Sequence, residues 1–187
     1  MKAVMISIQP KWVEKIVNGE KTIEVRKTAP KEVPFKCYIY ETQGQYVKFT
    51  HGAHTKYGYG RGKVIGEFIC DKVEMVNAKC SDYGIDLFYH DCLTNGCLTE
   101  REIEKYFNVP EDRDLRAMKG NGYVWNISDL KIYDKLKELS EFRKPCDRFL
   151  DCCTCRRLVR NEYMSCDNKI NRPPLSWCYV EELGEEE

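Results

Sequence analysis

The sequence lacks any apolar stretch approaching the roughly 20 residues that a membrane span needs. Its first eight residues hold one lysine and a short apolar run, which Gln9, Pro10 and Lys11 interrupt, so the start lacks the core of a signal peptide. Internal repeats and low-complexity tracts are also missing. Hydrophobic residues make up 42% of the 187 residues, which excludes a wholly disordered chain. We therefore expect a globular cytoplasmic protein without membrane contacts.

Net charge is missing too, because 30 Lys/Arg balance 30 Asp/Glu. A neutral chain at first argues against a nucleic-acid partner, but the distribution of charge matters more than its sum. Residues 1–63 carry 12 Lys/Arg against 5 Asp/Glu, and residues 143–172 carry 8 against 4. Two basic segments separated by an acidic stretch suit a protein with one positive face, although such clusters also occur on ordinary solvated surfaces.

Short apolar patterns indicate the secondary structure. Residues 43–63 are polar, aromatic and rich in glycine, and they are expected to form a long loop. The expected strands are 2–8, 22–26, 35–42, 64–76 (one long strand or a pair), 123–127 and 177–181, with helices from Pro10 to Asn18-Gly19 and over 98–107, and a helical turn over 134–142. Short strands, few helices and long loops predict an α+β fold, a small β-barrel with two or three peripheral helices.

An octapeptide after the first helix has the pattern G-x-K-x-x-E-x-R. It reads Gly19-Glu20-Lys21-Thr22-Ile23-Glu24-Val25-Arg26. Because Glu24 and Arg26 are two apart on a predicted strand, their side chains share one face. A lysine and an arginine beside one carboxylate form a polar pocket that suits a phosphate or the edge of a base. The spacing leaves open the alternative of a surface ion-pair ladder.

At this motif the sequence resembles the ASCH family of PUA-like β-barrels. A strand and a helix that starts at Gln9-Pro10 precede the motif, as in ASCH proteins. The segments 123–127 and 172–180 look like those of phage and prophage ASCH proteins. The resemblance implies binding of RNA or a modified nucleotide.

The resemblance also implies a site made of Lys21, Glu24 and Arg26, and it brings an alternative function. Some small ASCH proteins resemble amidohydrolases that deacetylate N4-acetylcytidine, and others are described as ribonucleases. In the amidohydrolases the lysine acts with a threonine, whose position is Glu24 here. That departure counts against the amidohydrolase activity, so a hydrolase is kept as the second reading.

Further candidate contacts lie in the segment after residue 50, which interleaves aromatic, glycine and basic residues. Such a segment can stack bases and touch phosphates, or it can be a connector whose tyrosines cover the barrel. The residues predicted to bind nucleic acid are, besides Lys21 and Arg26, Tyr57, Tyr59, Arg61, Lys63 and, from the last strand, Trp177. Trp12 and Trp125 are expected in the core.

Cysteine is abundant, with 11 residues, and without a secretion signal this favours thiols or metal over disulfides. Cys152-x-x-Cys155 has the spacing that brings two thiolates to one ion, and Cys146 and Cys166 flank this turn. Residues 143–172 hold few large apolar side chains and need a staple to fold.

We therefore predict a structural zinc site at Cys146, Cys152, Cys155 and Cys166. Cys153 could replace Cys152 as a ligand, and a redox dithiol or a loop with incidental cysteines are the alternatives. The expected organisation is a barrel made of residues 1–142 plus 173–187, interrupted by a zinc-stapled insertion over 143–172.

Overall fold

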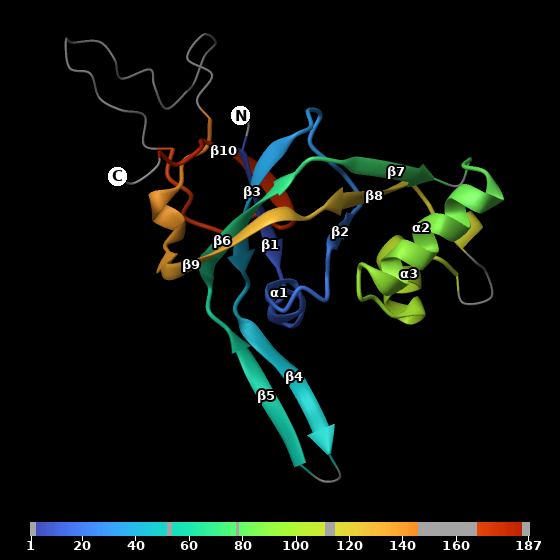
Figure 1. Ribbon diagram of the computed structural model, residues 1–187, viewed down its shortest axis with the longest axis horizontal. Coiled ribbons are helices and arrows are strands. Elements are labelled where there is room, and N and C mark those ends of the chain that lie inside the picture. The colour runs from blue at the N-terminus through green and yellow to red at the C-terminus, as the bar shows by residue number, and fades with distance from the viewer. Residues whose placement is uncertain (1–2, 52–53, 78, 111–114, 146–167, 185–187) are drawn as a thin grey trace.

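The structure is a computed structural model that describes residues 3–51, 54–77, 79–110, 115–145 and 168–184 (Figure 1). In chain order the elements are β1 (Ala3–Ile8), α1 (Pro10–Val17), β2 (Ile23–Arg26), β3 (Phe35–Glu41), β4 (Gly44–His51), β5 (His54–Gly60), β6 (Lys63–Cys70), β7 (Val73–Asn77), α2 (Asp82–Thr94), α3 (Glu100–Phe107), η1 (Leu115–Ala117), β8 (Asn121–Asn126), β9 (Ser128–Lys137), η2 (Leu139–Glu141) and β10 (Trp177–Val180). None of the helices described is long and apolar enough to cross a membrane.

A five-stranded sheet forms the centre of the fold, in the order β10-β1-β3-β6-β9. β1 runs parallel to β3, and the other pairings in this sheet are antiparallel. In β3, Phe35, Cys37 and Ile39 face one core while Tyr38 and Tyr40 face another, as the alternation in the sequence predicts. The sheet is thus covered on both faces, which explains the nearly continuous apolar sequence of its central strands.

Helix α1 packs on one face of this sheet and delivers the chain into the motif. Its buried residues Val13 and Ile16 join the same core as Phe35. The helix starts at Pro10, as predicted, and Gly19 follows its end with a φ of +75°. Glycine adopts this left-handed conformation without the steric cost that a side chain adds, so β2 can begin four residues later.

A second sheet, β2-β8-β7, packs against helices α2 and α3 (Figure 1). Phe88 of α2 and Phe107 of α3 meet edge to face, with ring centroids 5.6 Å apart, in a core that includes Val25 of β2. Helix α3 begins with a capping box formed by Thr99 and Glu102. This second core fixes α3 beside the motif strand.

The prediction of a closed β-barrel is wrong for the described residues, whose strands form separate sheets. β6 runs on into β7, and β8 into β9, but the strands change partners near Lys72 and Ile127. There the Asn126 N–H donates to the Lys72 carbonyl and the Ile127 N–H to the Thr22 carbonyl, at 3.0 Å each. Because the ladder is interrupted at this point, β2 pairs only with β8 among the described strands.

Residues 44–51 and 54–60 form a pair of β-strands, a β-hairpin, instead of the predicted long loop. β4 and β5 pair with each other and extend away from the rest of the described chain beyond α1 (Figure 1). Tyr46 donates a hydrogen bond of 2.7 Å to Glu14 of α1, and its ring lies against Gly58, where a Cβ would come within 2.5 Å. The glycines that indicated a loop therefore permit close packing within a strand pair.

Two other elements differ from the prediction. Helix α2 occupies a segment where we expected none, because its apolar residues do not lie on one stripe: Ile85 and Phe88 are buried, but Tyr83 and Leu87 are exposed. Strand β9 extends to Lys137 and so occupies the first part of the segment 134–142 expected to be a helical turn, where the helical turn is confined to η2, Leu139–Glu141. Its many charged residues mask the alternation of a strand.

The predicted insertion starts and ends at neighbouring points. Arg143 and Lys169 form an antiparallel bridge, and the Lys144 N–H donates to the Asn168 carbonyl at 2.9 Å. The four predicted zinc ligands, Cys146, Cys152, Cys155 and Cys166, lie outside the described residues. In the part of the chain that is described, no cluster of His, Cys, Asp and Glu could hold a metal ion, so the zinc site and the division into two domains remain predictions.

Candidate functional site

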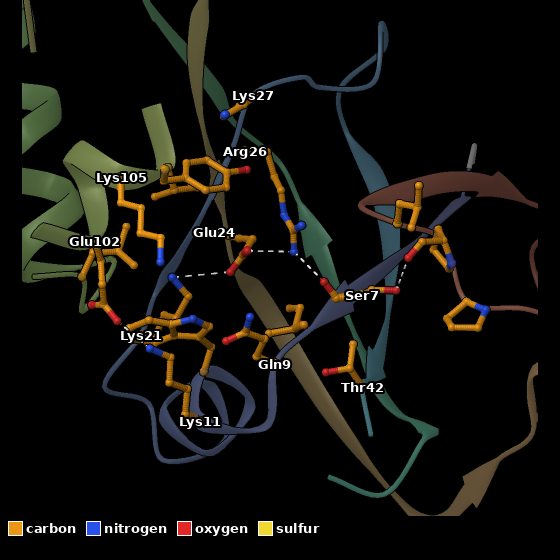
Figure 2. A pocket seen from close by; sticks show the side chains of 18 of the residues that line it. Ser7, Gln9, Lys11, Lys21, Glu24, Arg26, Lys27, Thr42, Glu102 and Lys105 are labelled. Carbon is orange, nitrogen blue, oxygen red and sulfur yellow. Dashed lines mark hydrogen bonds and ion pairs between the residues drawn. The ribbon is translucent and has the colours of Figure 1, made fainter. Parts of the chain in front are cut away.

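A cavity of about 810 Å³ lies where α1, β2, α3 and the segment before β10 meet. Figure 2 shows that Glu24 stands between Lys21 and Arg26, while Glu102 and Lys105 approach from α3. The motif predicted from the sequence therefore borders an open cavity large enough for a nucleotide-sized ligand.

The three charged residues of the motif form one buried network. Lys21 Nζ lies 3.4 Å from Glu24 Oε2, and Arg26 Nη2 lies 2.9 Å from Glu24 Oε1. Their side chains are only 3%, 9% and 11% exposed in chain order. This burial excludes the surface ladder left open by the spacing, since a surface pair would be largely hydrated.

The network also ties distant segments together. Lys21 donates to the carbonyl of Gly96, between α2 and α3, at 2.8 Å. Arg26 donates to the carbonyl of Ser7 at 2.8 Å and to the hydroxyl of Ser176 at 3.3 Å. Within the described residues, Glu24 Oε2 and Arg26 Nε are buried without a hydrogen-bond partner. The network thus fixes the cavity wall and retains unused hydrogen-bonding capacity.

The cavity has an excess of positive charge. Five of its lining residues are basic and two are acidic; the basic ones are Lys11, Lys21, Arg26, Lys27 and Lys105. Glu24 offsets the buried pair, and Glu102 forms an ion pair with Lys11 at 2.5 Å. No carboxylate among the described residues pairs with Lys27 or Lys105. A concave, low-dielectric site with this balance concentrates anions.

Two aromatic rings support the basic side chains. Nζ of Lys11 and of Lys21 lie 4.1 and 5.6 Å from the Trp12 ring centroid, and Nζ of Lys27 lies 5.0 Å from that of Tyr106. Such contacts hold cations in place by cation–π attraction. Trp12, expected in the core, packs against the first core as a partly buried residue and also lines the cavity. Burial raises the pKa of Tyr106 above its usual value, so its hydroxyl remains available as a donor.

The Lys11–Glu102 pair should make the stability of the fold decrease as the pH falls into the acid range. Burial opposes ionisation of Glu102, but hydrogen bonds from Lys11 and Thr99 outweigh it, so its pKa is lowered in the folded state. A lowered pKa contributes stability above the ordinary value of about 4.5 that is lost as the pH falls below it. We expect Glu102→Gln to flatten the fall in melting temperature below pH about 4.5. Equal slopes for both proteins would contradict this.

The other predicted contacts lie away from the cavity. Tyr57 and Tyr59 are exposed on β5 of the hairpin. Arg61 lies at the base of the hairpin, 3.6 Å from Glu41, and Lys63 is paired with Glu138. Trp177 donates to the Thr28 hydroxyl at 3.0 Å and packs edge-on against Trp125. The structure therefore brings the motif residues together at the cavity, whereas the other residues predicted to bind nucleic acid lie elsewhere.

Several cavity residues were missed in the sequence. Lys105 and Tyr106 come from α3, and no spacing rule connects them with a motif some 80 residues earlier. Lys27 directly follows the motif and stood outside its pattern. Lys11 directly follows Pro10, where a helix was expected to start. That expected start was the local signal that could have placed the Lys11 side chain at a helix N-terminus.

The fold is similar to that of solved ASCH proteins. The ASCH protein from Zymomonas mobilis is 16% identical and superposes with a TM-score of 0.57, over 97% of this chain and 89% of that one. The structure of a Tyr-to-Phe mutant of that protein is 15% identical in sequence, with a TM-score of 0.55 over 97% of this chain and 92% of that one. The structure of a Ser-to-Ala mutant is 16% identical, with a TM-score of 0.57 over 97% of this chain and 89% of that one. No protein-family model and no curated protein matches the chain in sequence.

The overall fold is therefore that of solved ASCH proteins, as the resemblance predicted. The relationship to phage proteins and the cysteine-rich insertion remain predictions.

Proposed function

We propose that this protein binds nucleic acid, RNA or a modified nucleotide, with a phosphate held in the cavity. The observation that carries the proposal is the excess of basic over acidic residues lining the cavity. Lysine and arginine side chains are well suited to bind phosphate groups. The ASCH fold adds support, because the resemblance at the motif implies an RNA ligand.

The arrangement gives the cavity residues separate roles. Lys27 and Lys105 are the basic residues without a carboxylate partner among those described, so they can contact phosphate oxygens without breaking an ion pair. Lys21, Glu24 and Arg26 form the wall behind them. The aromatic rings of Trp12 and Tyr106 keep the cations oriented.

A salt titration of oligonucleotide binding tests the proposal. Each lost phosphate contact lowers the slope of log K against log salt by about 0.7 for a single strand. The double variant Lys27→Gln, Lys105→Gln should therefore bind a fluorescent RNA more weakly and with a slope shallower by about 1.4. The matched control, Lys131→Gln with Lys135→Gln, removes two exposed lysines of β9. An unchanged slope in the cavity variant would contradict the proposal.

The contacts of Lys21 bear on the alternative function, a hydrolase. A lysine that acts as base or nucleophile needs a free lone pair, but Lys21 donates to Gly96 and faces Glu24. Turnover of RNA or N4-acetylcytidine that Lys21→Met abolishes, with binding retained, would favour the hydrolase.

Zinc binding by Cys146, Cys152, Cys155 and Cys166 is proposed from their spacing alone. Elemental analysis of protein purified without added zinc should find about one ion per chain. No bound metal, with the same melting curve in chelator, would remove this proposal and leave the cavity proposal intact.

A further inference from the structure

The outer face of the β4–β5 hairpin is an exposed apolar surface. Val47, Tyr57 and Tyr59 are 55%, 48% and 71% exposed. The strand register places Val47 opposite Tyr57 and Gln45 opposite Tyr59, and alternate residues of a strand share one face. Tyr46, on the other face, packs toward α1. An isolated two-stranded hairpin is marginally stable by itself, so this anchor on α1 is what presents the outer face.

The charge of this segment favours a polyanionic partner. From residue 42 to residue 66 the chain has no Asp or Glu, but it has four basic residues, Lys48, Lys56, Arg61 and Lys63. The carboxylates that pair with Lys48, Arg61 and Lys63 come from outside the segment. The hairpin thus presents aromatic rings without a negative charge of its own to repel phosphates.

The hairpin adjoins the cavity at its base. Gly60 leaves no room for a side chain against the Thr42 carbonyl and the ring of Pro10. Thr42 and Gln9 line the cavity. A strand of nucleic acid that leaves the cavity past Thr42 therefore meets the hairpin next.

We propose that the outer face of the hairpin binds the bases of a single-stranded nucleic acid whose backbone is held in the cavity. The inference rests on the proposed function, which supplies the polyanionic ligand. It adds that this ligand is single-stranded, with bases that are not paired. An aromatic side chain stacks on a base whose face is free, which a single strand offers and a duplex does not.

The spacing of the two tyrosines fits this role. Two residues apart on β5, their Cα atoms are separated by about 7 Å, which is about twice the 3.4 Å step between stacked bases. One base therefore fits between the rings of Tyr57 and Tyr59. Recognition of this kind is tolerant of sequence, because every base has a π face.

The test compares a labelled RNA of about 15 nucleotides, a length within the usual single-strand site size, with its blunt duplex. The variant Tyr57→Ser, Tyr59→Ser should lose at least about tenfold in affinity for the single strand and keep the salt slope of the unaltered protein. The variant Tyr57→Phe, Tyr59→Phe retains the rings and should bind normally. Tyr83→Ser, which alters a tyrosine 77% exposed on α2, is the matched control.

The outcomes separate the two proposals. Normal binding by the Ser double variant, or an equal loss for single strand and duplex, overturns the hairpin inference. If the Lys27 and Lys105 variant still shows its shallower slope in that case, the cavity proposal stands. If the unaltered protein shows no salt-dependent binding of either the single strand or the duplex, the cavity proposal fails, and the hairpin inference fails with it.

Discussion

Replacement of Glu24 with alanine should lower the free energy of unfolding by about 3–5 kcal/mol, the usual cost of removing one partner from a buried ion pair. Its carboxylate lies between the ammonium group of Lys21 and the guanidinium of Arg26. These two side chains are 3% and 11% exposed. Without Glu24, two buried cations would face each other with no carboxylate between them, and their backbone contacts to Gly96 and Ser7 would be strained.

Urea unfolding followed by tryptophan fluorescence measures this loss. Glu24→Gln keeps the volume and an acceptor oxygen, so it should be less damaging than Glu24→Ala. The control Glu74→Ala breaks an exposed pair with Lys72 and should leave the unfolding midpoint unchanged. If Glu24→Ala were as stable as this control, the network would contribute no net stability, and its role would be confined to the ligand.

Replacement of Trp125 with alanine should cost about 3–5 kcal/mol, the range for large aromatic side chains in a core. Trp125 belongs to β8 of the smaller sheet, is fully buried, and packs edge-on against Phe35 of the larger sheet at 5.2 Å. It is also the register partner of Glu24 on β2. The packing void that alanine leaves in the core would loosen the junction between the sheets and shift β2, which carries Glu24. RNA affinity, under the proposed function, should therefore fall along with stability.

Two variants give this prediction its control. Tyr83→Ala removes an exposed ring and should leave the thermal midpoint unchanged. Trp125→Phe should cost less than Trp125→Ala, because the buried indole Nε1 has no hydrogen-bond partner among the described residues and only volume is lost. A phenylalanine variant as unstable as the alanine variant would show that the indole N–H makes a hydrogen bond that stabilises the fold.

Local spacing predicted the first part of the fold well. A helix start at Pro10, its end at Gly19 and the alternation in β2 and β3 are all decided by neighbours within a few residues. The strand change near Lys72 depends instead on pairing with segments more than 50 residues away. No local pattern encodes it, and for that reason a closed barrel was expected in place of separate sheets.

The same distinction applies to the site. Lys21, Glu24 and Arg26 stand within six residues, with Glu24 and Arg26 on β2 and Lys21 two residues before it, so their local spacing explains why they meet. Lys105 and Tyr106 reach the cavity because Phe107 packs in the second core and fixes the orientation of α3. The hairpin was missed because its glycines are typical of a loop, whereas its strand pairing and its contact with Glu14 are seen only in the structure.

The bonds from Arg26 to Ser176 and from Ser7 to Pro174 have a consequence for synthesis of the chain. They join residues 150 and 167 positions apart, and the segment at residues 173–175 closes one side of the cavity. A nascent or prematurely ended chain that stops before residue 173 would already display the basic motif without its enclosing wall. Under the proposed function, fragments that end there should therefore bind anions with less discrimination than the full chain.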